Sequence, residues 1–107
     1  MDDGPIDDYF QVSVDSEATP PRVTASGEID AASAEEFGQA IDSALEAGGG
    51  VVLDLGAVTF MDSSGLRVIA VALRRAREHD RPFTVAPASD AVQRIFDITG
   101  VTALLNP

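Results

Sequence analysis

The chain has no cysteine, no tryptophan and no lysine, and its single histidine is His79. Without cysteine it can form no disulfide framework, no thiolate metal site and no thiol redox switch. Its longest apolar run, Val68–Leu73, is far too short to span a bilayer. The first residues are acidic where a secretory signal would be basic, so we expect a cytoplasmic protein that does not enter a membrane.

Basic residues are scarce as well. Eighteen Asp and Glu residues oppose seven arginines, which gives a formal net charge of −11. This charge repels nucleic acid and anionic membranes, so neither is expected as a direct partner, whereas a protein with a basic face would be attracted. The length suits one domain with one core. We expect an acidic flexible tail over residues 1–8 and a single domain over residues 9–107, with no cofactor and no metal site.

Apolar patterning predicts the strands. Apolar and polar residues alternate over 10–14, and a turn with two prolines leads into a second strand, so these two strands should form an antiparallel hairpin. The apolar run Val51–Leu55 is typical of a strand that is buried on both faces. The expected strands are 10–14, 23–29, 51–55, 83–86 and a last short one at 101–105.

Helical spacing predicts three helices between and after these strands. The first begins at Ser33, which forms a capping box with Glu36, and it stops at three consecutive glycines. The second begins at Ser63 or Ser64. The residues expected to face the core are Leu66, Ile69, Ala70 and Leu73 in the second helix and Val92, Ile95 and Phe96 in the third. A hairpin followed by β-α-β-α-β-α predicts an α/β fold, with a mixed β-sheet and helices packed over it.

The chemical focus of the sequence is the junction between the central strand and the second helix. At this junction the side-chain oxygen of Ser63 or Ser64 can accept a backbone N–H that the helix leaves unpaired. The same N–H groups and the positive end of the helix dipole favour an anion. A hydroxyl at a helix start, next to Asp62, is therefore the candidate functional group.

We do not expect an enzyme. A nucleophile elbow of the form Gly-x-Ser-x-Gly would need glycine at Met61. His79 follows Ser63 by sixteen residues, which is roughly 24 Å along a helix at about 1.5 Å per residue, so the two cannot form a Ser–His couple. The remaining catalytic alternative is an acid–base pair of carboxylates at one end of the sheet. Its candidate residues are Glu28, Asp30, Asp54 and Asp62.

Two interpretations of Ser63 are open on the residues alone. It can cap the helix and do nothing else, or it can carry a phosphate. A phosphate would add about −1.5 to −2 charges and three strong acceptor oxygens at the helix start. Arg67, one turn further on, is placed to reach such a group, while Asp62 would oppose it by like-charge repulsion.

Four segments resemble a known family. They are Gly27–Asp30, Val52–Leu55, Phe60–Leu66 and Arg94–Gly100. Their sequences and their order resemble a STAS domain, and more narrowly they are similar to the bacterial anti-sigma factor antagonists. The element Asp-Ser-Ser-Gly-Leu is specific in that company, and the resemblance extends from the first strand to about residue 105.

The resemblance implies a phosphorylation switch. In that family the serine directly after the aspartate is phosphorylated by a partner that is both an anti-sigma factor and a serine kinase. This residue corresponds to Ser63, with Ser64 as the alternative. The unphosphorylated protein would bind the kinase and release its sigma factor, and a phosphatase of the PP2C type would restore it.

The resemblance also implies a surface for the kinase partner. An acidic residue after the second strand faces the kinase in the family, and here it corresponds to Asp30. Arg67 departs from the pattern, because close relatives often have glycine at that position. The expected partner-binding residues are Asp30, Asp62, Ser63, Ser64, Gly65 and Arg67.

An alternative keeps the fold and changes the function. In this alternative the STAS module binds a nucleotide or a lipid, or it serves as a subunit of a transport or stressosome assembly. Its distinguishing feature would be an apolar groove, to which Val68, Val71 and Ala72 could contribute because they lie off the main buried stripe of the second helix.

Overall fold

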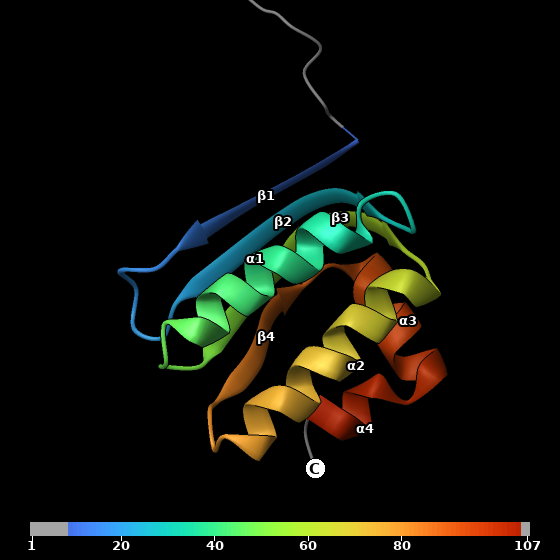
Figure 1. Cartoon of the computed structure of the whole chain (residues 1–107). Coiled ribbons are helices and arrows are strands. Elements are labelled where there is room, and N and C mark those ends of the chain that lie inside the picture. Colours follow the sequence, from blue (N-terminus) through green and yellow to red (C-terminus); the bar gives the residue numbers. More distant parts are fainter. Residues whose placement is uncertain (1–8, 106–107) are drawn as a thin grey trace, which may run out of the picture.

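The computed structural model describes residues 9–105, so the expected acidic tail over residues 1–8 lies outside the described residues. The elements are β1 (Phe10–Asp15), β2 (Arg22–Ile29), α1 (Ala34–Glu46), β3 (Val51–Met61), α2 (Ser63–Glu78), β4 (Phe83–Ala88), α3 (Asp90–Thr99) and α4 (Val101–Leu105). Figure 1 shows one four-stranded sheet with the helices packed against it.

The strands follow one another in the sheet in chain order, β1-β2-β3-β4. β1 and β2 pair antiparallel, whereas β2, β3 and β4 are parallel. One row of paired residues, Val14, Val23, Leu53 and Val85, crosses all four strands. The predicted hairpin and the mixed α/β sheet are therefore confirmed.

The helices cover one face of the sheet and leave the other face open. In β3, Val51, Leu53 and Leu55 are completely buried, while Val52 and Asp54, which point the other way, are only partly buried. The prediction of a strand buried on both faces was therefore wrong. The strand also continues to Met61, six residues beyond its expected end at Leu55.

Helices α1 and α2 lie side by side and run in the same direction, because each connects two parallel strands (Figure 1). Their contact is close at Gly38, where an added Cβ would lie 3.6 Å from Cγ1 of Val68. Further along the pair, Arg75 Nη1 donates to Asp42 Oδ1 at 2.7 Å. The two helices thus contact each other at two points along their length, at Gly38 and Val68 and again where the long Arg75 side chain reaches Asp42.

The buried stripe of α2 is turned further toward α1 than the sequence predicted. Ile69 and Leu73 are buried as expected, but Leu66 and Ala70 are only partly buried. Ala72, expected off the stripe, is 3% exposed. The reason is that α2 packs on α1 as well as on the strands, so its apolar face is shared between two neighbours.

The last segment, Val101–Leu105, is helix α4 and not the expected strand. Gly100 ends α3 in the left-handed conformation with φ 83°, which suits glycine because it has no Cβ. One residue then separates α3 from α4, so the new helix packs back on α3 and cannot reach the free edge of β4 as a fifth strand. Val101 is buried there.

Replacing either of two helical glycines by alanine should change the free energy of unfolding, but in opposite directions. Gly38→Ala places its Cβ at ordinary contact distance from Val68, so we expect the higher helix propensity of alanine to raise the free energy of unfolding by about 0.5–1 kcal/mol. At Gly65 the added Cβ would lie 2.7 Å from Met61 Cγ and 2.8 Å from Ile29 Cγ2. Gly65→Ala should therefore cost about 1–3 kcal/mol.

Urea unfolding of both variants measures this difference. A stabilised Gly65→Ala protein would contradict the close approach of α2 to the strands, and a clearly destabilised Gly38→Ala protein would contradict the spacing of α1 and α2.

Candidate functional site

The candidate site lies at the end of the sheet where β2 and β3 stop together. Ile29 and Met61 are the last paired residues of these strands, and the next residues are Asp30 and Asp62. The backbone N–H of Asp62 donates to the carbonyl oxygen of Ile29 at 3.1 Å. Because Ser63 opens α2 directly after Asp62, the two aspartates and this serine lie at one edge of the molecule.

Asp62, and neither of the serines, caps α2. Its backbone is extended, and its Oδ1 accepts a hydrogen bond from the backbone N–H of Ser64 at 2.8 Å. The prediction that Ser63 or Ser64 supplies the cap was therefore wrong. Ser63 is instead the first helical residue, with an exposed side chain, and Ser64 is partly buried. No hydrogen bond within residues 9–105 engages the hydroxyl of Ser63.

Gly65 fixes the start of α2 against the strand ends. Its position leaves no room for a side chain, since Met61 and Ile29 already fill the space that a Cβ would need. Gly65 is buried, so it contributes packing at the site and no accessible group. This contact and the Asp62 cap together determine where Ser63 lies relative to the sheet.

Asp30 and Ser33 organise the turn between β2 and α1. Asp30 Oδ1 accepts from the backbone N–H groups of Ala32 at 3.0 Å and Ser33 at 3.3 Å. The Ser33 hydroxyl belongs to a residue that is 4% exposed, and it donates to the carbonyl of Glu28 at 2.9 Å and accepts from the Asp30 N–H at 3.0 Å. The expected capping box between Ser33 and Glu36 is absent because this turn already uses the Ser33 hydroxyl.

Arg67 lies one turn after Ser63 on α2, and its side chain is exposed. No ion pair joins it to another residue of the range 9–105. An exposed hydroxyl, the positive end of the helix dipole and a guanidinium without an ion-pair partner in the described range therefore occur together at this helix start. Such a combination can accommodate a phosphate on Ser63, against the repulsion of the neighbouring Asp62 carboxylate.

Of the four carboxylates proposed for acid–base catalysis, only Asp54 lies apart, because Glu28, Asp30 and Asp62 are all at the ends of β2 and β3 next to Ser63. Asp54 pairs with Thr24 within the sheet and lies seven residues before Met61, roughly 23 Å at about 3.3 Å per residue. Its carboxylate on the open face accepts from Arg22 Nη2 at 2.9 Å. Glu28 is exposed near the end of β2, away from Asp54. Residues 9–105 also contain no group of three or more carboxylates and histidines placed to hold a metal ion.

The pKa of Asp54 is lowered by its surroundings. Partial burial acts to raise it, but the hydrogen bond from Arg22, the N–H of Gly56 and the attraction of the guanidinium together outweigh burial. This carboxylate is thus part of a structural ion pair on the open face and has no place at the Ser63 edge.

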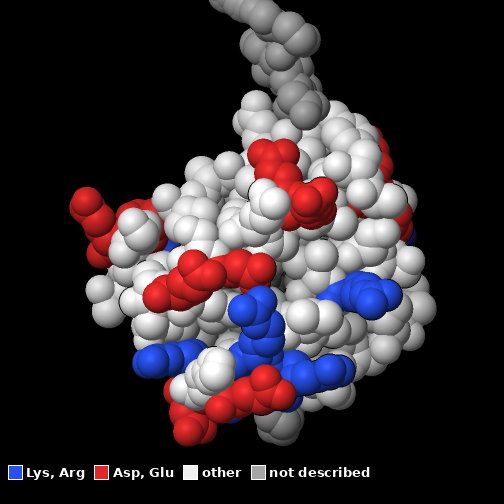
Figure 2. All heavy atoms as spheres, viewed as in Figure 1, with Lys and Arg blue, Asp and Glu red and all other residues white. Residues whose placement is uncertain are grey.

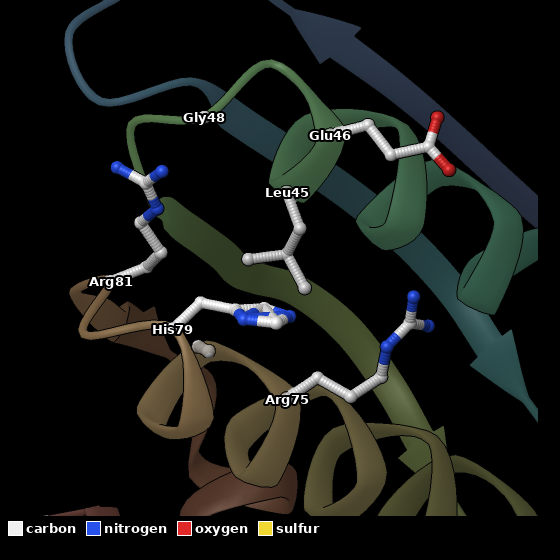
Figure 3. A pocket seen from close by; sticks show the side chains of 7 residues that line it. Leu45, Glu46, Gly48, Arg75, His79 and Arg81 are labelled. Atoms are coloured by element: carbon white, nitrogen blue, oxygen red, sulfur yellow. The ribbon is translucent and has the colours of Figure 1, made fainter.

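His79 lies at the opposite end of α2 from Ser63. It caps the C-terminus of the 16-residue helix, so about 24 Å of helix separates the two residues at about 1.5 Å per residue. Figure 3 shows the His79 ring below Leu45, with Arg75 and Arg81 on either side of it. These residues line a cavity of about 480 Å³ between the C-terminal ends of α1 and α2. No Ser–His couple forms, as predicted.

The groove expected for a ligand-binding module is present between α1 and α2. Val68, Val71 and Ala72 all line it, with Ala72 as buried floor, and its volume is about 410 Å³. The sequence did not predict that its walls are charged, because this depends on which residues of α1 face α2.

Residues 12–106 match a family described as Mlab, STAS domain. The chain belongs to the STAS domain family. An anti-sigma-B factor antagonist of Listeria monocytogenes is 33% identical over 86 residues, which cover 78% of this chain and 75% of that protein. The predicted family membership is confirmed.

Solved structures agree with this assignment. An anti-sigma factor antagonist from Mycobacterium paratuberculosis gives a TM-score of 0.82 at 27% identity, covering 94% of this chain and 86% of that one. Unphosphorylated SpoIIAA, an anti-sigma factor antagonist, gives 0.73 at 20% identity, covering 87% and 84% of the two chains. Phosphorylated SpoIIAA from Bacillus gives 0.65 at 19% identity, covering 87% and 86%. The two SpoIIAA structures share the fold of this STAS domain.

The helices of this STAS domain are short or amphipathic. Within residues 9–105, none of them combines the length and the apolar character needed to cross a membrane.

Two substitutions at Asp62 separate the effect of its capping hydrogen bond from the effect of its negative charge. Asp62→Ala removes the acceptor for the Ser64 N–H, so we expect the free energy of unfolding to fall by about 1 kcal/mol. Asp62→Asn keeps a hydrogen-bond acceptor at the same place, so its free energy of unfolding should fall much less. Urea unfolding measures both, and equal losses would mean that the negative charge, and not the hydrogen bond, stabilises the helix start.

The Arg22–Asp54 pair should make stability depend on pH. Because the folded-state pKa of Asp54 is lowered, its contribution is present above the unfolded pKa of about 3.9 and is lost as the pH falls through the folded value. Asp54→Asn should therefore be less stable than wild type at pH 7, and the difference should shrink below about pH 4. Arg22→Gln is the matched variant and should show the same convergence in urea unfolding. A difference that stays constant with pH would contradict this account.

Proposed function

We propose that this STAS domain is an anti-sigma factor antagonist whose unphosphorylated form binds an anti-sigma factor with serine kinase activity and releases its sigma factor. Phosphorylation of Ser63 switches it off, and a PP2C-type phosphatase restores it. The surface that meets the partner comprises Asp30, Asp62, Ser63, Ser64 and Arg67, and the buried Gly65 holds the start of α2 in place beneath it. The names of the relatives support the general role, and the geometry at Ser63 supports the switch.

The observation that best supports the switch is that Asp62, and not Ser63, caps α2. Asp62 satisfies the N–H of Ser64, so the Ser63 hydroxyl is not needed to hold the helix. It is exposed at the first helical position, where a kinase can reach it. Phosphorylation would thus change the surface without removing an interaction on which the fold depends.

The charge of the surface indicates how the switch acts. Asp30 and Asp62 suit a partner with a basic face, as does the net charge of −11. A neutral hydroxyl at the same edge can be buried in an interface at little cost. A phosphate at the same position brings about two charges that must be desolvated, and this costs several kcal/mol unless the partner supplies matching cations.

The surface on which the kinase docks can be the same surface whose phosphorylation releases it. The kinase must bring the γ-phosphate of its nucleotide to the Ser63 hydroxyl, so its active site has to lie over the start of α2. Arg67 projects from the next turn and can contact the partner before phosphorylation and the phosphate afterwards. SpoIIAA has the same fold in its unphosphorylated and phosphorylated forms, which supports a switch that acts on binding and leaves the fold unchanged.

The alternative, a module that binds a nucleotide or a lipid, has weaker support. The groove between α1 and α2 contains the apolar side chains of Val68 and Val71, but it is also lined by two carboxylates, Glu35 and Asp42, and two arginines, Arg67 and Arg75. Because these charges balance, the groove has no net positive charge to attract a polyphosphate or an anionic lipid headgroup. A role as a subunit of a transport or stressosome assembly would depend on contacts with other proteins. Such contacts are compatible with the Ser63 edge and with the groove.

Substitutions at Ser63 test the proposal. With the cognate anti-sigma kinase and ATP, we expect one phosphate per chain, retained in Ser64→Ala and lost in Ser63→Ala, as measured by mass spectrometry. Ser63→Asp should keep the wild-type circular dichroism spectrum but bind the kinase at least about 100-fold more weakly, which corresponds to about 2.7 kcal/mol. Ser63→Ala should bind constitutively.

Calorimetric titration of the kinase with each variant gives these affinities, and Ser43→Asp, at an exposed serine of α1 outside the proposed partner surface, is the matched control. The switch model fails if Ser63→Asp binds as tightly as wild type, or if it unfolds the domain.

A further inference from the structure

The groove between α1 and α2 has a feature that the phosphorylation switch does not use. It runs along the outer surface of the helix pair and has a volume of about 410 Å³. Its lining residues are Ala34, Glu35, Gly38, Gln39 and Asp42 from α1, and Arg67, Val68, Val71, Ala72 and Arg75 from α2. All the charged residues of one sign come from one helix, and all those of the other sign come from its neighbour.

We call Glu35 and Asp42 the acidic wall, and Arg67 and Arg75 the basic wall. Each wall has its two charges about two helical turns apart. The side chains of Asp42 and Arg75 meet at one end of the groove, where they are hydrogen-bonded at 2.7 Å. Glu35 and Arg67 line the other end, and their separation of 32 residues is close to the 33 residues between Asp42 and Arg75. Figure 2 shows the acidic atoms over α1 facing the basic atoms over α2.

The floor between the walls is apolar and open. Gly38 and Ala72 have little or no side chain, which makes the groove wide enough to admit side chains from outside. Val71 projects from α2 with 43% of its surface exposed, and Val68 is partly buried beside it. A charged frame around an apolar centre is typical of a surface that binds protein.

We propose that this groove is a self-association surface that pairs two copies of the chain about a two-fold axis running along the groove. Rotation about such an axis places α1 of one copy opposite α2 of the other, and it leaves the position of each residue along the groove unchanged. Glu35 of one copy then faces Arg67 of the other, and Asp42 faces Arg75. The Val71 side chains of the two copies meet at the centre.

The order of the charges selects this axis. A two-fold axis across the groove would place acidic wall against acidic wall and basic against basic, which costs energy by like-charge repulsion. The axis along the groove pairs opposite charges at both ends of the groove. The existing Asp42–Arg75 pair can then join its symmetry mate in a ring of four alternating charges, because a guanidinium has further N–H donors.

The groove also suits a second copy better than a highly charged ligand. Its two carboxylates and two guanidiniums balance, although the chain as a whole carries −11. The overall charges of two copies repel each other, and the apolar centre is small, so the dimer should be weak. We expect a dissociation constant between about 10 μM and 1 mM.

Sedimentation velocity of the full chain tests the proposal over a concentration series up to about 1 mM. We expect a monomer–dimer equilibrium in the wild type and a weakening of at least about tenfold in Val71→Asp, whose side chain is exposed and not needed for the core. A wild type that is monomeric at every concentration overturns the proposal, as does a dimer that Val71→Asp leaves intact.

Charge exchange tests the axis itself. Glu35→Arg alone places arginine opposite arginine, and Arg67→Glu alone places glutamate opposite glutamate, so each variant should be monomeric. An equimolar mixture should recover the dimer. In the mixed dimer the arginine introduced by Glu35→Arg faces the glutamate introduced by Arg67→Glu. On the other side of the axis, the unchanged Arg67 of the first copy faces the unchanged Glu35 of the second. Arg94→Glu on α3 makes the same change in charge outside the groove and should associate like wild type.

Three results would count against the two-fold arrangement: a mixture that stays monomeric, a single exchange variant that dimerises normally, or an Arg94→Glu protein as impaired as Arg67→Glu. Circular dichroism of each variant confirms that its helices are intact. Because the assay contains only this chain and no kinase, its outcome does not depend on whether a kinase recognises Ser63.

Discussion

The close approach of α2 to the ends of β2 and β3 determines the geometry of the whole site. Gly65 allows this approach, since Met61 and Ile29 occupy the space that any side chain there would need. The cap from Asp62 to Ser64 then sets the direction in which the helix leaves the strand. Ser63 is held between these two contacts, and its hydroxyl is exposed without a binding partner in the described part of the domain. The proposed phosphorylation of this hydroxyl would therefore disturb neither the cap nor the packing at Gly65.

Much of the fold follows from the sequence, because its alternation and helix spacing are strong. The hairpin, the three parallel strands and the position of α2 all depend on local patterns of apolar residues. The boundary of β3 was misjudged because Gly56 and Ala57 interrupt the pattern and a register shift lies between Leu53 and Leu55. The segment 101–105 was misjudged because five apolar and small residues fit a strand or a helix equally well, and only packing on α3 decides between them.

The sequence predicted where the candidate site residues lie, but not how they contact one another. Strand order alone brings Asp30, Asp62 and Ser63 to one edge. Which residue caps α2 could not be predicted, since aspartate and serine are equally good caps and the choice depends on one backbone torsion. Ser33 shows the same limit, because its hydroxyl can serve a helix cap or a turn and only the turn geometry settles the matter. The charged walls of the groove required the pairing of two helices that are distant in sequence.

The two edges of the sheet have a consequence for the behaviour of the protein at high concentration. β1 and β4 form these edges, and each is only six residues long. β4 contains Pro87, which has no backbone N–H, at the point where its register with β3 is irregular. An interrupted row of donors is a poor template for another strand, so growth into cross-β aggregates is disfavoured along this edge. The chain can therefore present its helical face to other proteins while the β4 edge of its sheet resists pairing with a further strand.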